Sequence, residues 1–173
     1  MYVQGDLLGD PLEHRKARGA FFTPPEICKF LTEWAVRSSG DVVLEPSCGE
    51  ASFLLEAARR LRSLGAQPTS LRDQLHGAEI HEASVEAATT ILNEKGFGAS
   101  IEACNFFDLS ARPAYDAVIG NPPYVRYQQF SGEARAKGLR AALAQGVRLT
   151  GLASSWAAFV IHGSQFLKPG GRL

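Results

Sequence analysis

Residues 41–53 read DVVLEPSCGEASF and change character twice. The apolar run 41–45 is typical of a short buried strand, and it ends on the carboxylate of Glu45. Pro46 to Gly49 then indicate a turn, and an amphipathic helix begins close to Phe53. A strand, a turn with glycine and a helix start form the first unit of a doubly wound sheet, where ligands bind beyond the carboxyl ends of the strands. By itself, the pattern favours an ordinary tight turn with Gly49 at positive φ.

Short apolar runs and helical stretches alternate through the rest of the chain. Further strands are predicted at 74–80, 100–104 and 115–120, and a fifth is expected to begin at 169–171. Helices with apolar side chains at helical spacing are predicted at 53–64, 82–95 and 155–168. Right-handed crossovers place such helices on both faces of a parallel sheet. The sequence therefore predicts an α/β fold with a doubly wound, mostly parallel sheet.

One more helix is predicted before the first strand. Thr23 is its candidate N-cap, and the two prolines that follow are tolerated in a first helical turn. The helix carries apolar side chains at helical spacing, which predict one buried face. These side chains are Ile27, Phe30, Leu31, Trp34 and Ala35.

The two ends and one internal stretch are less regular. Residues 1–20 are polar and interrupted by Gly, Asp and Pro, so we predict an N-terminal arm ahead of a domain at 21–173. The stretch 128–152 is expected to be part helix and part loop. Because Leu173 falls within the predicted fifth strand, we expect the sheet to be truncated there and the chain to be a fragment of a longer polypeptide.

Composition restricts the class of protein less than the motifs do. The chain has 173 residues, of which 45% are hydrophobic, enough to bury one sizeable core. Lys and Arg number 18, and so do Asp and Glu, a balance that does not favour nucleic-acid binding. Basic side chains nevertheless gather at 15–18 and between 121 and 156. Those of the second group are Arg126, Arg135, Lys137, Arg140 and Arg148. Either group could contact phosphates or form a solvated helix face.

Cysteine and histidine spacing gives no sign of a metal or of secretion. Cys28, Cys48 and Cys104 are far apart, and the histidines lack zinc-ligand spacing. We therefore expect a reduced, cytoplasmic protein without a metal. No apolar run is long enough for a signal peptide or a membrane span, so neither export nor membrane insertion is expected.

A second unusual segment follows the predicted strand 115–120. Residues 120–124 read Gly-Asn-Pro-Pro-Tyr. Two prolines fix the backbone and remove N–H donors, so they would hold Asn121 and an exposed carbonyl rigidly at a strand end, with Tyr124 nearby. A rigid loop with a packed tyrosine is the alternative. The combination of amide, carbonyl and aromatic ring favours a functional role.

Two further side chains stand close to predicted strand ends. Glu79 ends the second strand, where an acidic residue often binds ribose hydroxyls, although a surface carboxylate fits equally well. Phe106 follows the third strand and could lie against a purine ring, whereas most isolated phenylalanines belong to a core.

Together, these motifs and their order resemble the adenine-specific DNA methylases. The similar segments are GAFFTP (19–24), LEPSCGEASF (44–53), GAEI (77–80), NF (105–106), NPPY (121–124) and FLKPGG (166–171). The segment NPPY matches the catalytic motif of that family without a mismatch. The order, with Phe-Thr-Pro first, resembles the group in which a target-recognition domain follows the catalytic core.

The resemblance implies a Rossmann-like class I methyltransferase fold and an enzyme of a restriction-modification system. Such an enzyme transfers a methyl group from S-adenosylmethionine to the N6 amine of an adenine at a specific site in double-stranded DNA. A cognate restriction endonuclease or a fused nuclease is the implied partner, and no metal is expected. The implied cofactor-binding residues are Thr23, Glu45, Cys48, Gly49, Ala51, Glu79, Asn105 and Phe106.

The resemblance also assigns the catalytic residues. The Asn121 side-chain oxygen and the Pro122 carbonyl would accept the two protons of the adenine amine. Tyr124 would stack on the base after it has been flipped out of the duplex. Pro123 and Arg126 are the implied substrate contacts.

Three segments depart from the family pattern, at four positions. Ala51 stands where the first motif usually has its second glycine, which tightens the approach of the backbone to the cofactor. Asn105 replaces an aspartate that accepts from the cofactor's adenine, and an amide oxygen can still accept. His81 and Glu82 replace a common Asp-Pro pair. These departures concern cofactor affinity more than identity.

Two alternatives stay open. Methylases of protein glutamine and of guanine amino groups in RNA share the Asn-Pro-Pro-Tyr motif, and the Phe-Thr-Pro motif before the first strand disfavours them. The other alternative is a non-catalytic nucleic-acid-binding subunit with a decayed cofactor site. Ala51 and Asn105 support it, and the intact catalytic motif opposes it.

Overall fold

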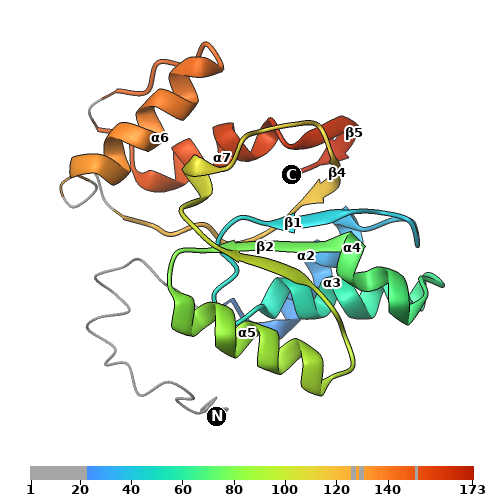
Figure 1. Ribbon diagram of the computed structural model, residues 1–173. Coiled ribbons are helices and arrows are strands. Elements are labelled where there is room, and N and C mark those ends of the chain that lie inside the picture. The colour runs from blue at the N-terminus through green and yellow to red at the C-terminus, as the bar shows by residue number, and fades with distance from the viewer. Residues whose placement is uncertain (1–22, 126–127, 129–130, 151) are drawn as a thin grey trace.

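The computed structural model describes residues 23–125, 128, 131–150 and 152–173. Its sheet lies between layers of helices (Figure 1). The strands are β1 (Val43–Glu45), β2 (Leu75–Glu79), β3 (Ser100–Ala103), β4 (Tyr115–Val118) and β5 (Leu167–Arg172). The helices are α2 (Pro25–Ala35), α3 (Ser52–Ser63), α4 (Leu71–Gln74), α5 (Glu82–Glu94), α6 (Gly132–Ala144) and α7 (Ser155–Ser164). Two 3-10 turns, η1 (Pro68–Ser70) and η2 (Phe106–Asp108), complete the described elements.

The sheet has the order β3-β2-β1-β4-β5, and the neighbouring strands pair in parallel. The chain builds outward from β1 to β3 and then returns to add β4 on the other side of β1. The direction of winding thus reverses between β1 and β4, which is the position where doubly wound sheets bind ligands. This topology confirms the predicted doubly wound, parallel α/β fold.

Alternation along the strands buries both faces of the sheet. Val43 of β1 is aligned with Leu75 and Ala117, and all three belong to a core that includes residues of α2, α3 and α5. Leu44 points the other way and joins Val118 in a second core, against which Phe159 of α7 packs. Figure 1 shows α2, α3 and α5 below the sheet, α7 above it, and α6 as the outermost helix.

Helix α2 differs from its prediction in two respects. Its N-cap is Pro24 rather than Thr23, with no side-chain hydrogen bond to the cap. Its buried residues are the small Cys28, Thr32 and Ala35, because small side chains let α2 pack closely on α3. The exposed fractions of the large apolar side chains are Ile27 47%, Phe30 69%, Leu31 39% and Trp34 50%. The expected burial is therefore wrong for these four residues and right for Ala35.

The junction between α7 and β5 also differs from its prediction. The helix ends at Ser164, not at Lys168, and β5 begins at Leu167. Phe166 is buried in the second core, and its carbonyl accepts from the Ala114 and Tyr115 N–H groups, each at 3.0 Å. The helix must end before Phe166 for both contacts to form. The segment 169–171 is an irregularity inside β5, where the register with β4 shifts, and not the beginning of the strand.

The uncertain stretch 128–152 contains α6, which packs on α7 and η2. Helix and loop are thus both present, as predicted. In the part of the chain that the structure describes, no helix is both long and apolar enough to cross a membrane. The predicted arm 1–20 lies outside the described residues.

Candidate active site

Two carboxylates stand at the carboxyl ends of neighbouring strands. Glu45 ends β1 and is 3% exposed, and Glu79 ends β2 and is 8% exposed. Between these ends and the start of α3 runs the β1 loop, residues 46–51. A buried carboxylate needs hydrogen-bond donors, and both side chains find theirs in the backbone.

Glu79 organises the β1 loop from the neighbouring strand. One oxygen, Oε2, accepts from the Gly49 N–H at 3.0 Å, and the other, Oε1, accepts from the His81 N–H at 3.0 Å. The Cys48 N–H donates to the Ala78 carbonyl at 3.0 Å, so a second bond ties the same loop to β2. The sequence pattern placed Glu79 at the end of β2, and the structure confirms this position.

Glu45 is held differently. Its Oε2 accepts from the Leu54 N–H at 3.0 Å, in the first turn of α3. Burial raises the pKa of the Glu45 carboxyl well above its usual range; the Leu54 bond opposes this and the charge of Glu79 adds to it. The site thus contains a carboxyl group for which the protonated form is favoured by its surroundings.

The small residues of the β1 loop shape it around these carboxylates. Cys48 is buried, and burial raises the pKa of its thiol. A Cβ atom on Gly77 of β2 would lie 3.0 Å from the Cys48 Sγ atom, so glycine leaves the space that Cys48 fills. Ala51 has φ 62° and ψ 30°, the left-handed conformation that glycine adopts without strain, and its side chain is fully buried.

Thr23 precedes α2 and contacts its first turn. Its carbonyl oxygen accepts from the Cys28 Sγ atom at 3.6 Å. Burial, with added repulsion from the Glu45 and Glu56 carboxylates, raises the pKa of the Cys28 thiol to about 11. Cys28 belongs to the same buried core cluster as Cys48 and Ala51 of the β1 loop.

Beyond β3, Asn105 and Phe106 have distinct surroundings. The Asn105 side-chain oxygen accepts from the Phe107 N–H at 3.0 Å and so caps η2. Phe106 is 3% exposed. The centroid of its ring lies 5.4 Å from that of Phe159 and 5.3 Å from that of Phe166. Phe106 therefore lies in a core, which was the alternative to contact with a purine ring in the sequence analysis. Its contact with a cofactor stays a prediction.

The Asn-Pro-Pro-Tyr loop, residues 120–124, leaves β4 next to Glu45. The Ile119 N–H donates to the Leu44 carbonyl at 2.9 Å and fixes the start of the loop to β1. Gly120 has φ 155°, and a Cβ atom there would lie 3.4 Å from the Glu45 Cγ atom. Asn121, Pro122 and Pro123 are half-buried, and Tyr124 is 52% exposed.

Sequence reasoning missed one residue that holds this loop. Ser155 opens α7, is 2% exposed, and makes hydrogen bonds to both Pro123 and Val125. These partners are 30 and 32 residues away along the chain. No local pattern around Ser155 indicates them, because helix-start serines are common in any sequence.

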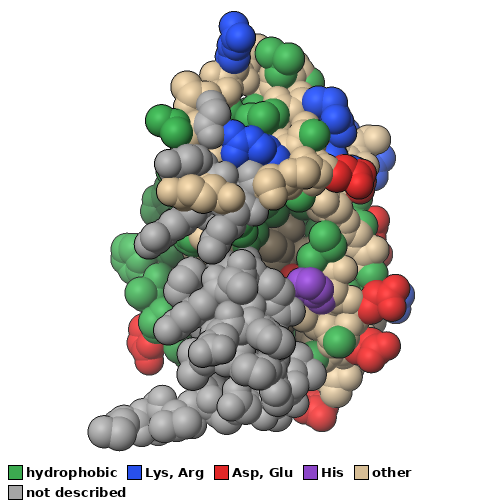
Figure 2. Space-filling view, turned by 90° about the vertical axis from the view of Figure 1, so that its left-hand side faces the viewer, with side chains coloured by type: hydrophobic (Ala, Val, Ile, Leu, Met, Phe, Trp, Pro, Cys, Tyr) green, Lys and Arg blue, Asp and Glu red, His purple; other side chains and the backbone are tan. Residues whose placement is uncertain are grey.

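The predicted basic stretch lies partly on α6. Lys and Arg side chains gather at the upper end of Figure 2, which is the α6 end of Figure 1. Lys137 makes an ion pair with Asp108 at 2.6 Å and a longer one with Glu133 at 3.4 Å. The structure therefore favours a structural role for Lys137, whose ion pair with Asp108 links α6 to η2. Arg126, the predicted substrate contact, lies outside the described residues.

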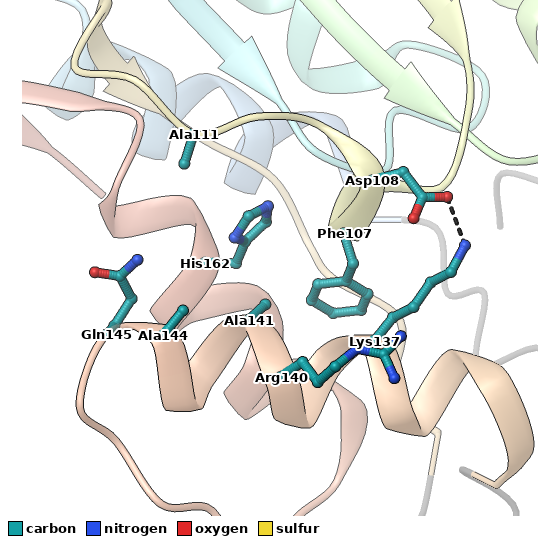
Figure 3. A pocket seen from close by; sticks show the side chains of 9 residues that line it. All are labelled: Phe107, Asp108, Ala111, Lys137, Arg140, Ala141, Ala144, Gln145 and His162. Carbon is teal, nitrogen blue, oxygen red and sulfur yellow. Dashed lines mark hydrogen bonds and ion pairs between the residues drawn. The ribbon is translucent and has the colours of Figure 1, made fainter.

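A cavity of about 580 Å³ adjoins this ion pair, between η2 and α6. Figure 3 shows Phe107 and His162 facing α6 across it. Its lining residues are Phe107, Asp108, Ala111, Lys137, Arg140, Ala141, Ala144, Gln145 and His162. None of the predicted site residues lines it. The residues that the sequence singled out lie instead at the ends of β1 to β4.

Comparison with known proteins shows the family of the chain. Residues 8–173 match the family model described as N-6 DNA Methylase. The chain belongs to the N-6 DNA methylase family. Among curated relatives of this N-6 DNA methylase chain is the type II methyltransferase M.HincII of Haemophilus influenzae, 29% identical over 90% of the chain. Another is the type II restriction enzyme and methyltransferase RM.BcgI of Heyndrickxia coagulans, 30% identical over 67% of the chain. The chain spans 26% and 19% of the lengths of these two relatives.

Solved structures support the fold of this N-6 DNA methylase chain. The type I restriction-modification methyltransferase subunit of Streptococcus thermophilus superimposes with a TM-score of 0.62 at 23% identity. That match covers 87% of the chain and 33% of the other protein. DrdV in its complex with DNA matches with a TM-score of 0.64 at 19% identity, over 90% of the chain and 20% of DrdV. At these identities the likeness is one of fold.

Proposed function

We propose that this chain is the catalytic core of a methyltransferase that transfers a methyl group from S-adenosylmethionine to the N6 amine of adenine in DNA. The observation that carries the proposal is the contact of two motifs. Gly120, which precedes Asn121, packs against the side chain of Glu45, the last residue of β1 before the β1 loop. A base held by the Asn-Pro-Pro-Tyr loop would therefore adjoin a cofactor held at the ends of β1 and β2.

The residues at these strand ends fit the polar parts of the cofactor. Each Glu79 oxygen accepts one backbone N–H, and a carboxylate has about four acceptor sites, so capacity remains for ribose hydroxyls. The Asn105 oxygen, which accepts from Phe107, can accept a second hydrogen bond from an adenine amino group. Thr23, Cys48 and Gly49 would border the methionine end. When bound, S-adenosylmethionine supplies an electrophilic methyl group.

The chain's own contribution to the chemistry is at Asn121 and Pro122. The adenine amine is a poor nucleophile because its lone pair is delocalised into the ring. The Asn121 side-chain oxygen and the Pro122 carbonyl would accept its two N–H groups and draw the nitrogen toward a pyramidal state. Acceptors that are oriented in advance stabilise the positive charge that grows on the amine, and no strong base is required.

For the whole protein, we propose action at a specific site in double-stranded DNA within a restriction-modification system. Tyr124, which stands half-exposed at the end of the loop, would stack on the flipped adenine. Pro123 and Arg126 would contact the substrate. A cognate or fused nuclease is the partner that this proposal implies. The names of the type II relatives and the DNA complex of DrdV support it.

A non-catalytic subunit with a decayed cofactor site is the second candidate. The observations in its favour are the strained backbone at Ala51 and the use of Asn105 as a cap. Titration calorimetry with S-adenosylmethionine or S-adenosylhomocysteine separates the two candidates. Saturable binding supports the enzyme, and no heat at millimolar ligand concentration supports the decayed site.

The substitution Asn121→Ala tests the proposed function. We expect the rate of methyl transfer to duplex DNA in a single turnover to fall roughly a hundred- to a thousandfold, the usual effect of losing one preorganised hydrogen bond. Cofactor affinity should stay close to that of the natural protein, because Asn121 follows β4 and the cofactor contacts follow the other strands. The measurement is transfer of labelled methyl, with affinity determined in parallel.

A matched control is Asn93→Ala, on the exposed last turn of α5. Helix α5 starts beyond β2 and runs back along the sheet, so its C-terminal end is far from the Asn-Pro-Pro-Tyr loop. This variant should transfer methyl at the natural rate. If Asn121→Ala does so as well, the catalytic assignment is wrong and the segment is only a rigid loop.

A further inference from the structure

Ser155 joins the first turn of α7 to the end of the Asn-Pro-Pro-Tyr loop through three hydrogen bonds. Its hydroxyl donates to the Pro123 carbonyl and accepts from the Val125 N–H at 2.9 Å. Its own N–H donates to the Val125 carbonyl at 3.2 Å. Ser155 itself is 2% exposed. The two side-chain bonds are part-buried, so water competes with them less than with bonds at the surface.

The usual role of a serine at a helix start does not account for this geometry. Such a serine normally accepts from a backbone N–H of its own helix. In α7 the N-cap is Ser154, and it makes no side-chain cap hydrogen bond. The two hydrogen bonds of the Ser155 hydroxyl both go to the loop, so this hydroxyl serves the loop and not the helix.

The contacts fix the torsion angles that the two prolines leave free. Each proline ring sets only its own φ angle, so the ψ angle of Pro123 and both backbone angles of Tyr124 stay free. The Ser155 hydroxyl donates to the Pro123 carbonyl and accepts from the Val125 N–H. These two bonds hold the peptide planes on both sides of Tyr124. At the other end, the Ile119 bond to Leu44 fixes the start of the loop. The loop is thus held at both ends.

Tyr124 depends on this backbone support. Its side chain is 52% exposed, so packing alone restrains it little. Its direction follows from the peptide planes that Ser155 holds. Preorganised loops lose less entropy when they bind, so a ring that already points in one direction binds a base more tightly than a mobile ring.

We propose that Ser155 is a positioning residue for the catalytic reaction, which acts by setting the backbone of Pro123 and Tyr124 for the substrate base. The proposal rests on the proposed function, since it names a further residue of the same site. Ser155 does not touch the reacting atoms. Only a side chain that both donates and accepts can make these contacts, and among small residues a hydroxyl is the group that does so.

The closing experiment compares three variants with the natural protein: Ser155→Ala, Tyr124→Ala and the double variant. Loss of the two side-chain hydrogen bonds should lower the single-turnover methyl-transfer rate roughly tenfold, as expected for bonds of ordinary strength. Affinity for S-adenosylmethionine should not change. Because both single variants damage the same interaction, the double variant should lose much less than the product of the two single losses.

A readout without DNA separates this inference from the proposed function. Hydrogen exchange of the Val125 amide should be faster in Ser155→Ala than in the natural protein, whether or not the protein methylates DNA. Ser164→Ala, which removes an exposed hydroxyl that donates to the Ile161 carbonyl at the other end of α7, is the matched control and should change neither quantity.

Three outcomes would overturn the inference. These are an unchanged Val125 exchange rate, an unchanged transfer rate in Ser155→Ala, and rate losses that multiply independently in the double variant. If the natural protein does not methylate DNA at all, the proposed function fails, and the exchange result alone still decides whether Ser155 holds the loop.

Discussion

The β1 loop and the Asn-Pro-Pro-Tyr loop leave adjacent strands at the same edge of the sheet, and they are held by opposite means. In the β1 loop, backbone N–H groups point at carboxylates: Gly49 donates to Glu79, and Leu54, just beyond the loop, donates to Glu45. The Asn-Pro-Pro-Tyr loop is fixed by proline rings and by the neutral hydroxyl of Ser155. One loop is organised by carboxyl acceptors, and the other by proline rings and a hydroxyl group.

This difference fits what each loop would have to do. A loop that binds a ligand with hydroxyl and ammonium groups needs acceptors, and a carboxylate can serve the backbone and the ligand together. A loop that stabilises a growing positive charge needs dipoles that do not reorient. We therefore expect substitutions in the β1 loop to change cofactor affinity, and charge or pH to affect the Asn-Pro-Pro-Tyr loop little.

The largest effect expected on the β1 side is that of Glu79→Ala. The variant loses a carboxylate that holds two backbone N–H groups and would hold the ribose, so affinity for S-adenosylmethionine should fall roughly ten- to a hundredfold. Asp116→Ala is the matched control. The Asp116 carboxylate also accepts from a backbone N–H, that of Val42 at 2.8 Å, and from Lys168 at 2.7 Å.

Both variants should unfold at lower temperature, because each leaves a backbone donor without its partner. Only Glu79→Ala should weaken binding, since Asp116 lies near the amino end of β4, away from the β1 loop. Titration calorimetry and thermal unfolding measure the two effects. Equal loss of affinity in both variants would show that the loss reflects stability and would remove Glu79 from the cofactor site.

The sequence predicted the strand-end residues well because their positions follow from local alternation. Glu79 had to end β2 once the apolar run was recognised as a strand, and Asn121 had to follow β4 for the same reason. Alternation fixes which residues share a face, whereas the strand ends were predicted one or two residues too late, since β2 ends at Glu79 and β4 at Val118. Parallel pairing then brings those strand ends, and the motifs that follow them, to one edge of the sheet.

Contacts between distant segments could not be predicted in this way. The periodicity of α2 correctly groups Phe30 with Trp34, but it does not say which side of the helix packs on α3. The structure buries the side of Cys28 and Ala35 instead, because small residues allow closer approach. Ser155 was missed for a similar reason, since its partners are fixed only when α7 packs beside β4.

Glu45→Gln tests the role of charge at the end of β1. The folded-state pKa of Glu45 is raised above its unfolded value, chiefly by burial. Between these two pKa values the folded state binds more protons than the unfolded state, so stability falls as pH rises through that window. Glutamine keeps an oxygen for the Leu54 N–H but cannot ionise.

The variant should therefore be more stable than the natural protein at neutral pH, by an amount on the order of 1 kcal/mol. The gain should disappear below the ordinary carboxyl pKa of 4.5, where Glu45 is protonated in both states. Chemical unfolding at pH 4 and pH 7.5 measures it. A gain that is equal at both pH values would show that charge burial is not its cause.

The smallest effect is expected from Ala51→Gly, which restores the glycine usual in this family. Two contributions oppose each other. Glycine removes the strain of the left-handed backbone, worth about 1–2 kcal/mol, while loss of the buried methyl group costs about 0.8 kcal/mol. The Ala51 side chain belongs to the core that contains Phe53 and Leu54 and is 0% exposed, so it offers no surface to a ligand. The free energy of unfolding should consequently change by less than about 1 kcal/mol, and cofactor affinity by less than about twofold. Chemical unfolding and calorimetric titration of the two proteins give both numbers. A large gain in affinity would mean that the methyl group at position 51 crowds the cofactor, and that side-chain size, in addition to hydrogen bonds to carboxylates, sets the shape of the β1 loop.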